Sequence, residues 1–540
     1  MPTVIIDGIE VQLAAGERLN GIEVARRAGI DIPHYCWHPG LTVVASCRMC
    51  LVETGTRNPE SGAVTIVPKL VPACQTPAPP NTVFVTNSEK VRQSRAMVEE
   101  DLLLRHPIDC PICDKAGECY LQDYHFKYGQ DQRRADIRPF TSRRRDVGDT
   151  VTLFVDRCVM CTRCVRFTRE ISGGSELLVI NRGDHEEIDV FPGYPLADKM
   201  SGNVVDLCPV GALGDKDFLY EQRVWFMKKH PGVCTGCSTG CSIDVEENQD
   251  TVYRLKPREN QHVNAWWMCD EGRYGFHHVH SDRRLTNVER RDGQARTLLE
   301  WSQVVREIDE RFRAIGRVAA VLSPHLTVEE AYLLAKYARS VDPQAPLVLG
   351  PVPIVGQDET FKSGFTIRAE KCPNRRGVEE IIQHFVGRAA TFDELLSTGD
   401  LAERAVWVSG GYKSDWIDLA AAEPLAPAAC LVVQDLFASP LTDRTAYLLP
   451  GAAFAEREGS YVNHADRLQS VRWAIRPPAG VRVEAGVFWE LLGMPGLVKA
   501  RRVLDEVAAQ IPFFAAAAEP VGPLGIDLKV KALAEAAASG

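Results

Sequence analysis

The sequence predicts a multidomain chain in which small α+β domains precede an α/β domain. Three observations predict this fold class. The chain has 540 residues, which is too long for one hydrophobic core. Of its 17 cysteines, 15 lie at or before Cys269. From about residue 285, amphipathic helices alternate with short buried-strand patterns, as in a parallel sheet.

Composition and charge exclude several classes of protein. The net charge of −10 and the lack of a long basic face argue against a nucleic-acid partner. The first residues lack the basic start and apolar stretch of a signal peptide, and no apolar run reaches the length of a membrane span. We therefore expect a cytosolic chain that meets a membrane only through another protein. In a reducing cytosol, crowded cysteines indicate metal or redox chemistry.

Residues 1–87 combine a hairpin, a short helix and a cysteine loop. The alternating run 4–13 contains the turn signal Asp7-Gly8, and an amphipathic helix is expected near 19–28. A first set of cysteines follows in the plant-type order of a 2Fe-2S site, namely Cys36, Cys47, Cys50 and Cys74. These parts predict a β-grasp ferredoxin domain. The alternative is a buried apolar cysteine pair.

Residues 88–128 form the next predicted domain. A helix is expected over 88–105, with Ser88 as its N-cap, and Pro107 stops it. Three cysteines follow, and the other cysteines at or before Cys269 fall into sets of four, so His106 is needed as the missing fourth ligand. Taken alone, such a histidine is more often a surface or core residue. The second set is His106, Cys110, Cys113 and Cys119. The 15 cysteines plus His106 make 16 ligands, or four complete sites.

Residues 129–226 carry the densest cysteine motif. Cys158, Cys161 and Cys164 are spaced by two residues, and Cys208-Pro209 supplies a distant fourth ligand; these four cysteines are the third set. A tight turn of three thiolates with a remote fourth is typical of a 4Fe-4S cluster. Zinc is the rival, although zinc usually takes two separated ligand pairs. The flanking Arg157, Arg163 and Arg166 either influence the cluster or are solvated. The arginine-rich stretch 130–145 is read as a connecting loop, with a docking surface for an acidic partner as the alternative.

Residues 227–283 predict a small β-rich domain with a further 4Fe-4S site, again with zinc as the rival. Its ligands, the fourth set, are Cys234, Cys237, Cys241 and Cys269. Glycines between these cysteines allow backbone N–H groups to approach sulfur. Strands are expected at 242–245 and 251–255.

Residues 284–480 predict the α/β domain. Thr327 and Glu330 form a capping box. Buried parallel strands are expected at 318–322, 347–349, 405–408, 430–433 and 447–449. No nucleotide-binding glycine motif occurs. Cys372 and Cys430 are read as core or loop cysteines. Residues 481–540 are alanine-rich and are expected to be a helical tail.

Together these motifs resemble the large iron–sulfur subunit, the G subunit, of bacterial NADH-quinone oxidoreductase, respiratory complex I. The resemblance is dense across residues 1–215. It is carried by Cys47-Arg48-Met49-Cys50-Leu51-Val52-Glu53, by His106-Pro107 with Cys110-Pro111 and Gly117-Glu118-Cys119, and by Arg157-Cys158 through Cys164-Val165-Arg166-Phe167. Residues 216–470 are similar to molybdopterin oxidoreductases, with Glu458-Gly459-Ser460-Tyr461-Val462-Asn463 resembling a late segment of that domain.

The resemblance implies one 2Fe-2S cluster and three 4Fe-4S clusters, with the fourth set off the main electron route. It also implies a truncated molybdopterin-oxidoreductase-like domain without molybdenum, because the neighbours of Cys372 do not resemble a molybdenum site. The expected partners are a flavin- and NADH-binding subunit and a ferredoxin-like 4Fe-4S subunit of the same complex. Electrons would reach the first set, then the third and second sets, and continue toward quinone.

The expected location is the cytoplasmic side of the bacterial inner membrane, bound peripherally. One rival is a catalytic subunit of an NAD-linked formate dehydrogenase or the diaphorase arm of an NAD-linked hydrogenase. The other is a scaffold whose clusters only stabilise the fold.

Overall fold

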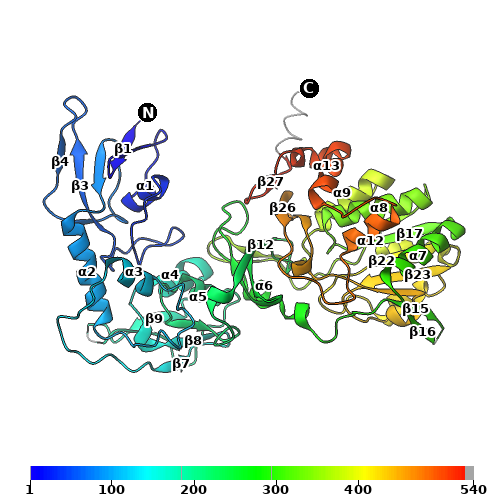
Figure 1. Ribbon diagram of the computed structural model, residues 1–540, viewed down its shortest axis with the longest axis horizontal. Coiled ribbons are helices and arrows are strands. Elements are labelled where there is room, and N and C mark those ends of the chain that lie inside the picture. Colours follow the sequence, from blue (N-terminus) through cyan, green and yellow to red (C-terminus); the bar gives the residue numbers. More distant parts are fainter. Residues whose placement is uncertain (1, 184, 294, 530–540) are drawn as a thin grey trace. The chain divides into compact units, whose positions relative to one another are not determined.

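A computed structural model describes residues 2–183, 185–293 and 295–529. The chain divides into two compact units (Figure 1). The first unit extends to Met227 and includes Phe361–Gly364, and the second contains Lys228–Thr360 and continues from Phe365. Each unit has its own sheets.

The first unit begins with a six-stranded sheet of order β2-β1-β6-β3-β4, in which β5 also pairs with β3. Its strands are β1 (Thr3–Ile6), β2 (Ile9–Gln12), β3 (Leu51–Arg57), β4 (Val64–Ile66), β5 (Val71–Pro72) and β6 (Thr82–Val85). The predicted hairpin is confirmed, since β1 and β2 pair antiparallel across Asp7 and Gly8, both with positive φ. The predicted helix is α1 (Gly21–Arg27), with Asn20 in a capping box.

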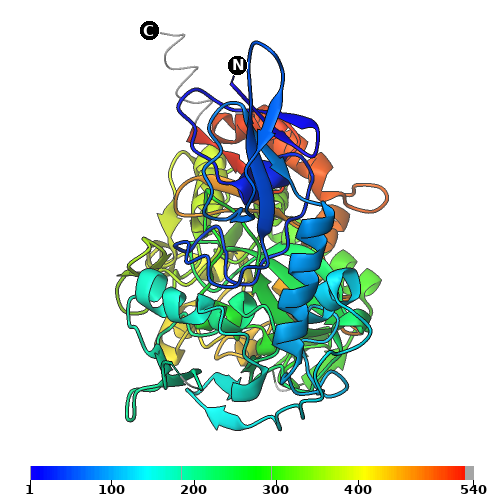
Figure 2. The ribbon, with the colours of Figure 1, turned by 90° about the vertical axis from the view of Figure 1, so that its left-hand side faces the viewer.

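Two helices surround the second set. The prediction of Ser88 as an N-cap is confirmed, since its hydroxyl accepts from the Val91 N–H at the start of α2 (Glu89–Leu103). Figure 2 shows α2 descending from the six-stranded sheet. The helix ends two residues before the expected limit at 105. Cys119 then caps α3 (Tyr120–Tyr128).

The rest of the first unit is made of short elements around the third set. The strands form sheets of order β11-β8-β7 and β10-β9. The elements are β7 (Arg144–Asp146), β8 (Val151–Phe154), η1 (Val155–Arg157), α4 (Arg163–Phe167), η2 (Thr168–Ser172), β9 (Leu177–Ile180), β10 (Glu187–Val190), α5 (Asn203–Leu207), β11 (Leu213–Asp215) and η3 (Val224–Phe226). Met160 and Thr162 have φ of +48° and +57°, so the chain turns tightly between the cysteines.

The second unit opens with an antiparallel sheet of order β12-β13-β14. The elements are β12 (Lys228–Val233), β13 (Ser242–Asn248), β14 (Thr251–Pro257), α6 (Asp270–Arg273) and η4 (His277–His280). Both strands predicted in this region are confirmed. The cysteine loop lies between β12 and β13, and Cys269 precedes α6.

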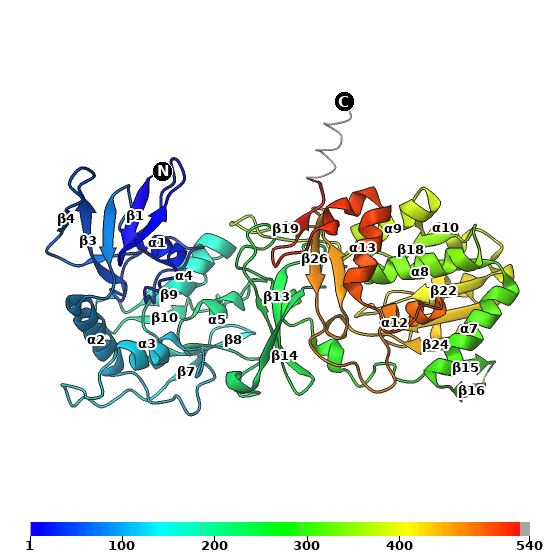
Figure 3. The ribbon, with the colours of Figure 1, turned by 45° about the horizontal axis from the view of Figure 1, so that its top comes forward.

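The second unit is dominated by an eight-stranded sheet of order β16-β15-β24-β23-β22-β17-β18-β21 (Figure 3). The strands are β15 (Glu289–Asp292), β16 (Ala295–Leu298), β17 (Val318–Leu322), β18 (Leu347–Leu349), β21 (Ala390–Thr391), β22 (Ala405–Ser409), β23 (Cys430–Asp435) and β24 (Tyr447–Pro450). All five predicted strands are present, and β24, β23, β22, β17, β18 and β21 pair in parallel.

Apolar cores cover both faces of this sheet. One face carries Leu322, Trp407 and Val432, and the other carries Val321 and Val408. The helices of the domain are α7 (Trp301–Ile315), α8 (Val328–Val341), α9 (Arg375–Val386), α10 (Phe392–Leu396), η5 (Leu401–Glu403), α11 (Leu419–Ala422), η6 (Glu423–Leu425), η7 (Thr442–Arg444) and η8 (Phe454–Glu456). The capping box predicted at Thr327 and Glu330 is confirmed at the start of α8.

The expectation of a helical tail is only partly right. Residues after 480 form α12 (Glu484–Leu491), α13 (Ala500–Gln510) and η9 (Pro512–Ala518), but they also form a strand, β27 (Ile526–Asp527). This strand joins a sheet of order β25-β26-β27 with β25 (Gly459–Val462) and β26 (Arg467–Val471), and a separate pair is β19 (Glu359–Thr360) with β20 (Thr366–Ile367). Phe488, Leu504 and Phe514 lie in the main core, so this segment belongs to the domain. Residues 530–540 of the predicted tail lie outside the described residues.

Candidate metal centres

The first set lies on the loops beside α1 and β3. Cys36, Cys50 and Cys74 are buried, and Cys47 is half-buried. A hydrogen bond from the Cys47 thiol lowers the pKa of Cys36 to about 5, and the same contact raises that of Cys47. A contact between Cys50 and Cys74 likewise lowers the pKa of Cys50 and raises that of Cys74. The structure therefore brings the four sulfurs together as two touching pairs.

The third set surrounds a cavity. Its four cysteines line a small cavity together with apolar side chains that include Leu153, Ile188 and Val210. The Met160 N–H lies 3.3 Å from Cys158 Sγ and donates to it. Burial raises the pKa of Cys161 to about 11, and burial together with the other three thiols raises that of Cys164. Ligands that surround a space suit a cluster, which offers a separate iron to each thiolate.

Three arginines beside the third set are buried, so the reading of these side chains as solvated is wrong. Arg157, Arg163 and Arg166 expose 3%, 4% and 1% of their surface. Arg157 pairs with Asp109 at 2.8 Å, but neither Arg163 nor Arg166 has a carboxylate partner within the part of the chain that the structure describes. A buried cation needs compensating negative charge. The neighbouring sulfurs are the nearest source of it once they are thiolates.

These arginines join the loop of the third set to that of the first. The Arg166 guanidinium donates to the carbonyl oxygens of Cys36 and Cys161, the latter at 3.2 Å. Arg163 donates to the carbonyl oxygens of Trp37 at 2.6 Å and Leu207 at 3.2 Å. Arg163 and Arg166 therefore each connect a residue at or next to a predicted ligand of the first set with one at or next to a predicted ligand of the third set.

The second set is the most exposed of the four. Cys110 is exposed, and Cys113 and Cys119 are half-buried. Its flanking apolar side chains point to solvent, since Ile108 is 79% and Ile112 58% exposed. Burial, followed by the charge of Arg157, lowers the pKa of His106 to about 4. Its imidazole is therefore neutral at pH 7, which is the form that can bind a metal.

The loops of the second and third sets pack directly against each other. Gly211, three residues after Cys208, lies so close to the second set that a Cβ there would be 2.2 Å from Cys113 Sγ. The Tyr120 N–H donates to the Pro209 carbonyl oxygen at 2.9 Å. Sequence reasoning missed the role of Gly211, whose only signal was a small residue after the Cys-Pro pair.

The fourth set lies in the second unit. The N–H groups of Gly236 and Gly272 each lie 3.4 Å from a sulfur, that of Cys234 and Cys269 respectively, and a Cβ at Gly272 would be 2.8 Å from Cys234 Sγ. The expectation that a glycine between the ligands brings its N–H to sulfur is confirmed at Gly236. Burial and the other three thiols raise the pKa of Cys241.

The other two cysteines are core residues, as predicted. Cys430 lies in β23, and the Cys372 thiol is fully buried, 3.7 Å from Glu370 Oε1. Across the described residues, no three His, Cys, Asp or Glu side chains converge as ligands of a single metal ion. No helix among those residues has both the length and the apolar character to cross a membrane.

The residues present fit iron–sulfur clusters. Soft thiolates are the ligands that iron–sulfur clusters take. The sulfurs gather in sets, the third set lines a cavity, and glycines at 211 and 272 leave room that a side chain would fill. Backbone N–H groups reach sulfur in the third and fourth sets, as expected for groups that stabilise cluster charge.

Four family models match successive parts of the chain. A 2Fe-2S iron–sulfur cluster binding domain matches residues 2–89, and the iron–sulfur binding region of NADH-ubiquinone oxidoreductase-G matches 95–134. The ferredoxin-like domain of NADH-quinone oxidoreductase subunit 3 matches 148–214, and the Fe4S4 domain of molybdopterin oxidoreductases matches 227–281. Each model contains one of the four sets.

Curated proteins similar to this chain are subunits of NADH-quinone or NADH-ubiquinone oxidoreductase. The chain is 32% identical over 333 residues to the G subunit of NADH-quinone oxidoreductase of Rickettsia felis, which covers 61% of this chain and 47% of that protein. It is 36% identical over 338 residues to the mitochondrial 78 kDa subunit of NADH-ubiquinone oxidoreductase of Neurospora crassa, covering 61% and 43%. It is 33% identical to the G subunit of Escherichia coli, in a match that covers 62% of this chain and 36% of that protein. The chain thus spans less than half of these relatives.

A solved structure of NAD+-reducing [NiFe]-hydrogenase in its H2-reduced state is 26% identical and covers 41% of this chain and 91% of the matched chain, with a TM-score of 0.34. That score carries no conclusion about the arrangement. The four family models, in this order along the chain, and the identity to the curated proteins agree: across its iron–sulfur domains this chain is similar to the G subunit of NADH-quinone oxidoreductase.

Proposed function

We propose that this chain is the iron–sulfur electron-transfer subunit of an NADH-quinone oxidoreductase. When bound, one 2Fe-2S and three 4Fe-4S clusters would accept and release single electrons between NADH, oxidised through FMN on a partner subunit, and quinone. The first set would hold the 2Fe-2S cluster and the other three sets the 4Fe-4S clusters. The chain itself would fix the positions of the clusters, shield them from solvent and place charged side chains beside them.

One observation carries this proposal: the loop of the third set contacts the loops of both the first and the second set. Arg166 joins Cys36 to Cys161 through their carbonyl oxygens, and Gly211 abuts Cys113. Loops that contact one another keep their ligand sets at fixed separations. This contact order supports a route from the first set through the third to the second, an order that ligand spacing alone does not give.

The exposed second set supports an outlet to a partner. Ile108 and Ile112 flank Cys110 at the surface, and apolar side chains grouped in this way are typical of protein interfaces. We assign this face to a ferredoxin-like 4Fe-4S subunit. Attachment to such subunits, and to the one that binds flavin, would hold the chain at the cytoplasmic side of the inner membrane, where the complex couples electron transfer to ion translocation.

The fourth set belongs to the second unit. We assign it to an additional cluster off the main route, as the resemblance to the G subunit implies. Molybdenum is not expected in the α/β domain. Cys372, the nearest candidate ligand, is fully buried beside Glu370 and does not line the cavity next to the fourth set.

EPR spectroscopy of the anaerobically purified complex, with iron, sulfide and molybdenum assays, tests the function. NADH should reduce the first, second and third clusters, and His106→Ala should disturb one 4Fe-4S signal while leaving the 2Fe-2S signal intact. If NADH reduces none of the clusters, the scaffold reading is correct. Bound molybdenum with formate oxidation, or co-purification with a hydrogenase, would select the other enzymes. Loss of the 2Fe-2S signal in His106→Ala would refute the ligand grouping.

A further inference from the structure

The loop of the fourth set, residues 234–241, is attached to the α/β domain by hydrogen bonds. The Ser238 N–H donates to the Glu370 carbonyl oxygen at 2.9 Å. From a second element of the domain, Gln469 Nε2 donates to the Gly240 carbonyl oxygen at 2.7 Å. These bonds hold the loop in place against the domain, so a charged side chain of the domain can act on the sulfurs of the loop.

Lys413 follows β22 at the carboxyl edge of the large sheet, in a segment that is held firmly. The Gly411 N–H donates to the Asp435 carboxylate at 2.8 Å. The buried Tyr412 ring stacks on Trp416, with 4.6 Å between the ring centroids. The backbone that carries Lys413 is therefore fixed from both sides of the residue.

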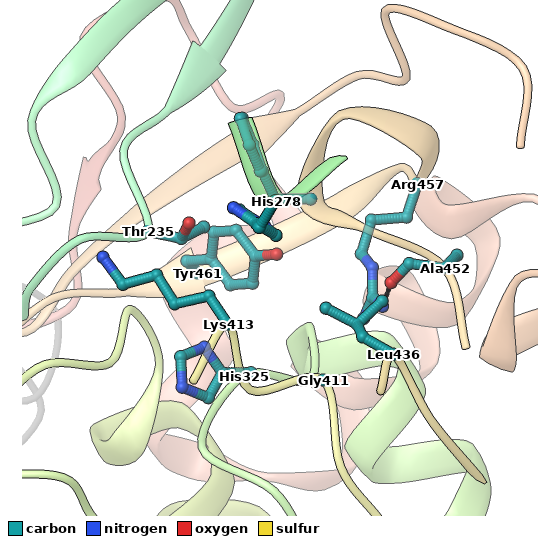
Figure 4. A pocket seen from close by; sticks show the side chains of 10 residues that line it. Thr235, His278, His325, Gly411, Lys413, Leu436, Ala452, Arg457 and Tyr461 are labelled. Carbon is teal, nitrogen blue, oxygen red and sulfur yellow. Dashed lines mark hydrogen bonds between the residues drawn. The ribbon is translucent and has the colours of Figure 1, made fainter. Parts of the chain in front are cut away.

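The side chain of Lys413 lies beside both chain segments that supply the fourth set. Lys413 and Thr235, the residue after Cys234, line the same small cavity. Figure 4 shows the ammonium on the side of Thr235 and away from the Tyr461 hydroxyl. In the segment that follows Cys269, a Cβ at Gly275 would be 3.6 Å from Lys413 Nζ. The sheet edge thus places a cation next to the cysteine loop.

This cation has no counterion. Within the described residues, the half-buried Lys413 has neither a hydrogen-bond partner nor an ion-pair partner. Two acidic side chains of the region are engaged elsewhere: Glu271 pairs with Lys371 at 2.6 Å, and Asp435 accepts from Trp416 Nε1 at 2.8 Å as well as from backbone N–H groups. A cation that is partly withdrawn from water gains from negative charge placed beside it.

The other basic side chains that line the cavity supply no free charge. Burial lowers the pKa of His278 to about 4 and that of His325 to about 3, so both imidazoles are neutral at pH 7. Arg457 pairs with Glu330 at 2.7 Å and with Glu484 at 3.1 Å. Lys413 is therefore the cation of this cavity that is left to act on the fourth set.

The thiol of Cys234 lies within reach of this charge. Burial raises the pKa of Cys234 to about 11, and the Gly236 N–H and the Lys413 ammonium oppose that rise. A cation that favours the thiolate also favours any more negative state of the same site. An iron–sulfur cluster gains one negative charge when it accepts an electron, and its potential follows the charge around it.

We propose that Lys413 raises the reduction potential of the cluster of the fourth set, so that the α/β domain sets how readily this cluster accepts an electron. The inference rests on the proposed function, in which the fourth set holds a 4Fe-4S cluster. Lys413 acts as a positioned charge and not as a ligand. The domain thus has a role toward the fourth set that needs no molybdenum.

Redox titration followed by EPR tests this role on the full, anaerobically purified chain with its clusters in place. Cys234→Ala identifies the signal of the fourth set, which should disappear with a loss of about four irons per chain. Lys413→Met keeps most of the side-chain volume and removes the charge. At a fixed potential, the ratio of reduced to oxidised cluster in the fourth set should then fall about tenfold, a shift of about 59 mV to a more negative potential for one electron.

Three further variants complete the experiment. Lys413→Gln is a second neutral replacement, which should shift the potential in the same direction and gives the result if Lys413→Met fails to fold. Lys413→Arg keeps the charge and should shift the potential much less. Lys499→Met changes an exposed lysine of the same unit, alters the net charge equally, and should leave the potential unchanged.

The outcomes separate this inference from the proposed function. Wild-type potentials in both Lys413→Met and Lys413→Gln would overturn the role of Lys413 and leave the cluster of the fourth set in place. An equal shift in Lys499→Met would show that net charge, and not the position of Lys413, is responsible. If Cys234→Ala changed neither the iron content nor the EPR spectrum, the proposed cluster itself would be wrong, and the inference with it.

Discussion

The second and third sets contain the same kind of predicted cluster in opposite surroundings. The third set lies among buried arginines and apolar side chains, with Cys161, Cys164 and Cys208 each less than a tenth exposed. The second set has an exposed cysteine and two exposed isoleucines. The contrast indicates a division of labour within the first unit. In the proposed function, the shielded set bridges its neighbours and the open set meets a partner.

The charges around the two sets differ in the same way. Arg163 and Arg166 are buried without carboxylate partners in the described part of the chain, whereas Arg157, which faces the second set, is paired with Asp109. An unpaired cation favours the more negative, reduced state of a nearby group. We therefore expect the arginines to stabilise the reduced state of a cluster in the third set more than that of a cluster in the second set.

The strongest way to break the comparison is to fill the space between the two sets. Gly211→Val places a side chain where a Cβ alone would be 2.2 Å from Cys113 Sγ. The second set should then fail to assemble, with a loss of about four irons per chain and of one 4Fe-4S signal. Iron assay and EPR measure this. Gly486→Ala is the control, because it adds a Cβ with nothing within 4 Å and should leave the iron content unchanged. A normal iron content in Gly211→Val would contradict the packing described.

Removing Arg166 tests the link between the first and third sets. Arg166→Met leaves the carbonyl oxygens of Cys36 and Cys161 without this donor, and we expect a loss of about 3 kcal/mol in the free energy of unfolding. Redox titration followed by EPR should also show more negative potentials for both clusters. Arg166→Lys keeps the positive charge but loses the planar guanidinium that donates to two carbonyl oxygens. The cluster potentials should therefore shift less in Arg166→Lys than in Arg166→Met. Equal potentials in Arg166→Met and the wild type would show that the cation has no electrostatic role.

A charge introduced on the exposed face of the second set tests whether this face binds a partner. Ile112→Glu should change the free energy of unfolding by less than about 0.5 kcal/mol, because the side chain is 58% exposed. Affinity for the ferredoxin-like partner should fall by about tenfold or more, measured by surface plasmon resonance. Leu298→Glu, at a residue 67% exposed in the second unit, is the matched control and should bind normally. Equal partner affinity for Ile112→Glu and Leu298→Glu would contradict the proposal that the partner binds this face.

Differential iron loss is the mildest test. Under a chelator and limited air, the EPR signal of the second set should decay severalfold faster than that of the third, because Cys110 is exposed while Cys161 and Cys164 are buried. The time course of both signals in one sample is the measurement. Faster decay of the third set would reverse the comparison.

Much of the fold follows from local patterns. Asp7-Gly8 predicts its hairpin because both residues tolerate positive φ, and Thr327 with Glu330 predicts a helix start because each caps a backbone N–H of the other. The five central strands are recognisable because strands buried on both faces are continuously apolar. Residues 481–529 are harder to interpret, because alanine-rich helices and a two-residue strand gain their stability from the core they join.

The proposed ligand sets come from cysteine spacing and counting, whereas the relation between the sets cannot be obtained in that way. An arginine beside a cysteine can point to solvent or inward, and only the burial of Arg166 and its bonds to Cys36 and Cys161 decide between the two. Gly211 carries no chemistry of its own. Its importance depends on Cys113, almost a hundred residues earlier in the sequence, lying against it. Contacts between distant segments are not encoded in local spacing.

Distances between the reduced clusters, measured by pulsed EPR on the NADH-reduced complex, test the central claim most directly. If the third set bridges the other two, its distances to the first and to the second set are both shorter than the distance between the first and second sets. A first-to-second distance shorter than either of the others would contradict the account.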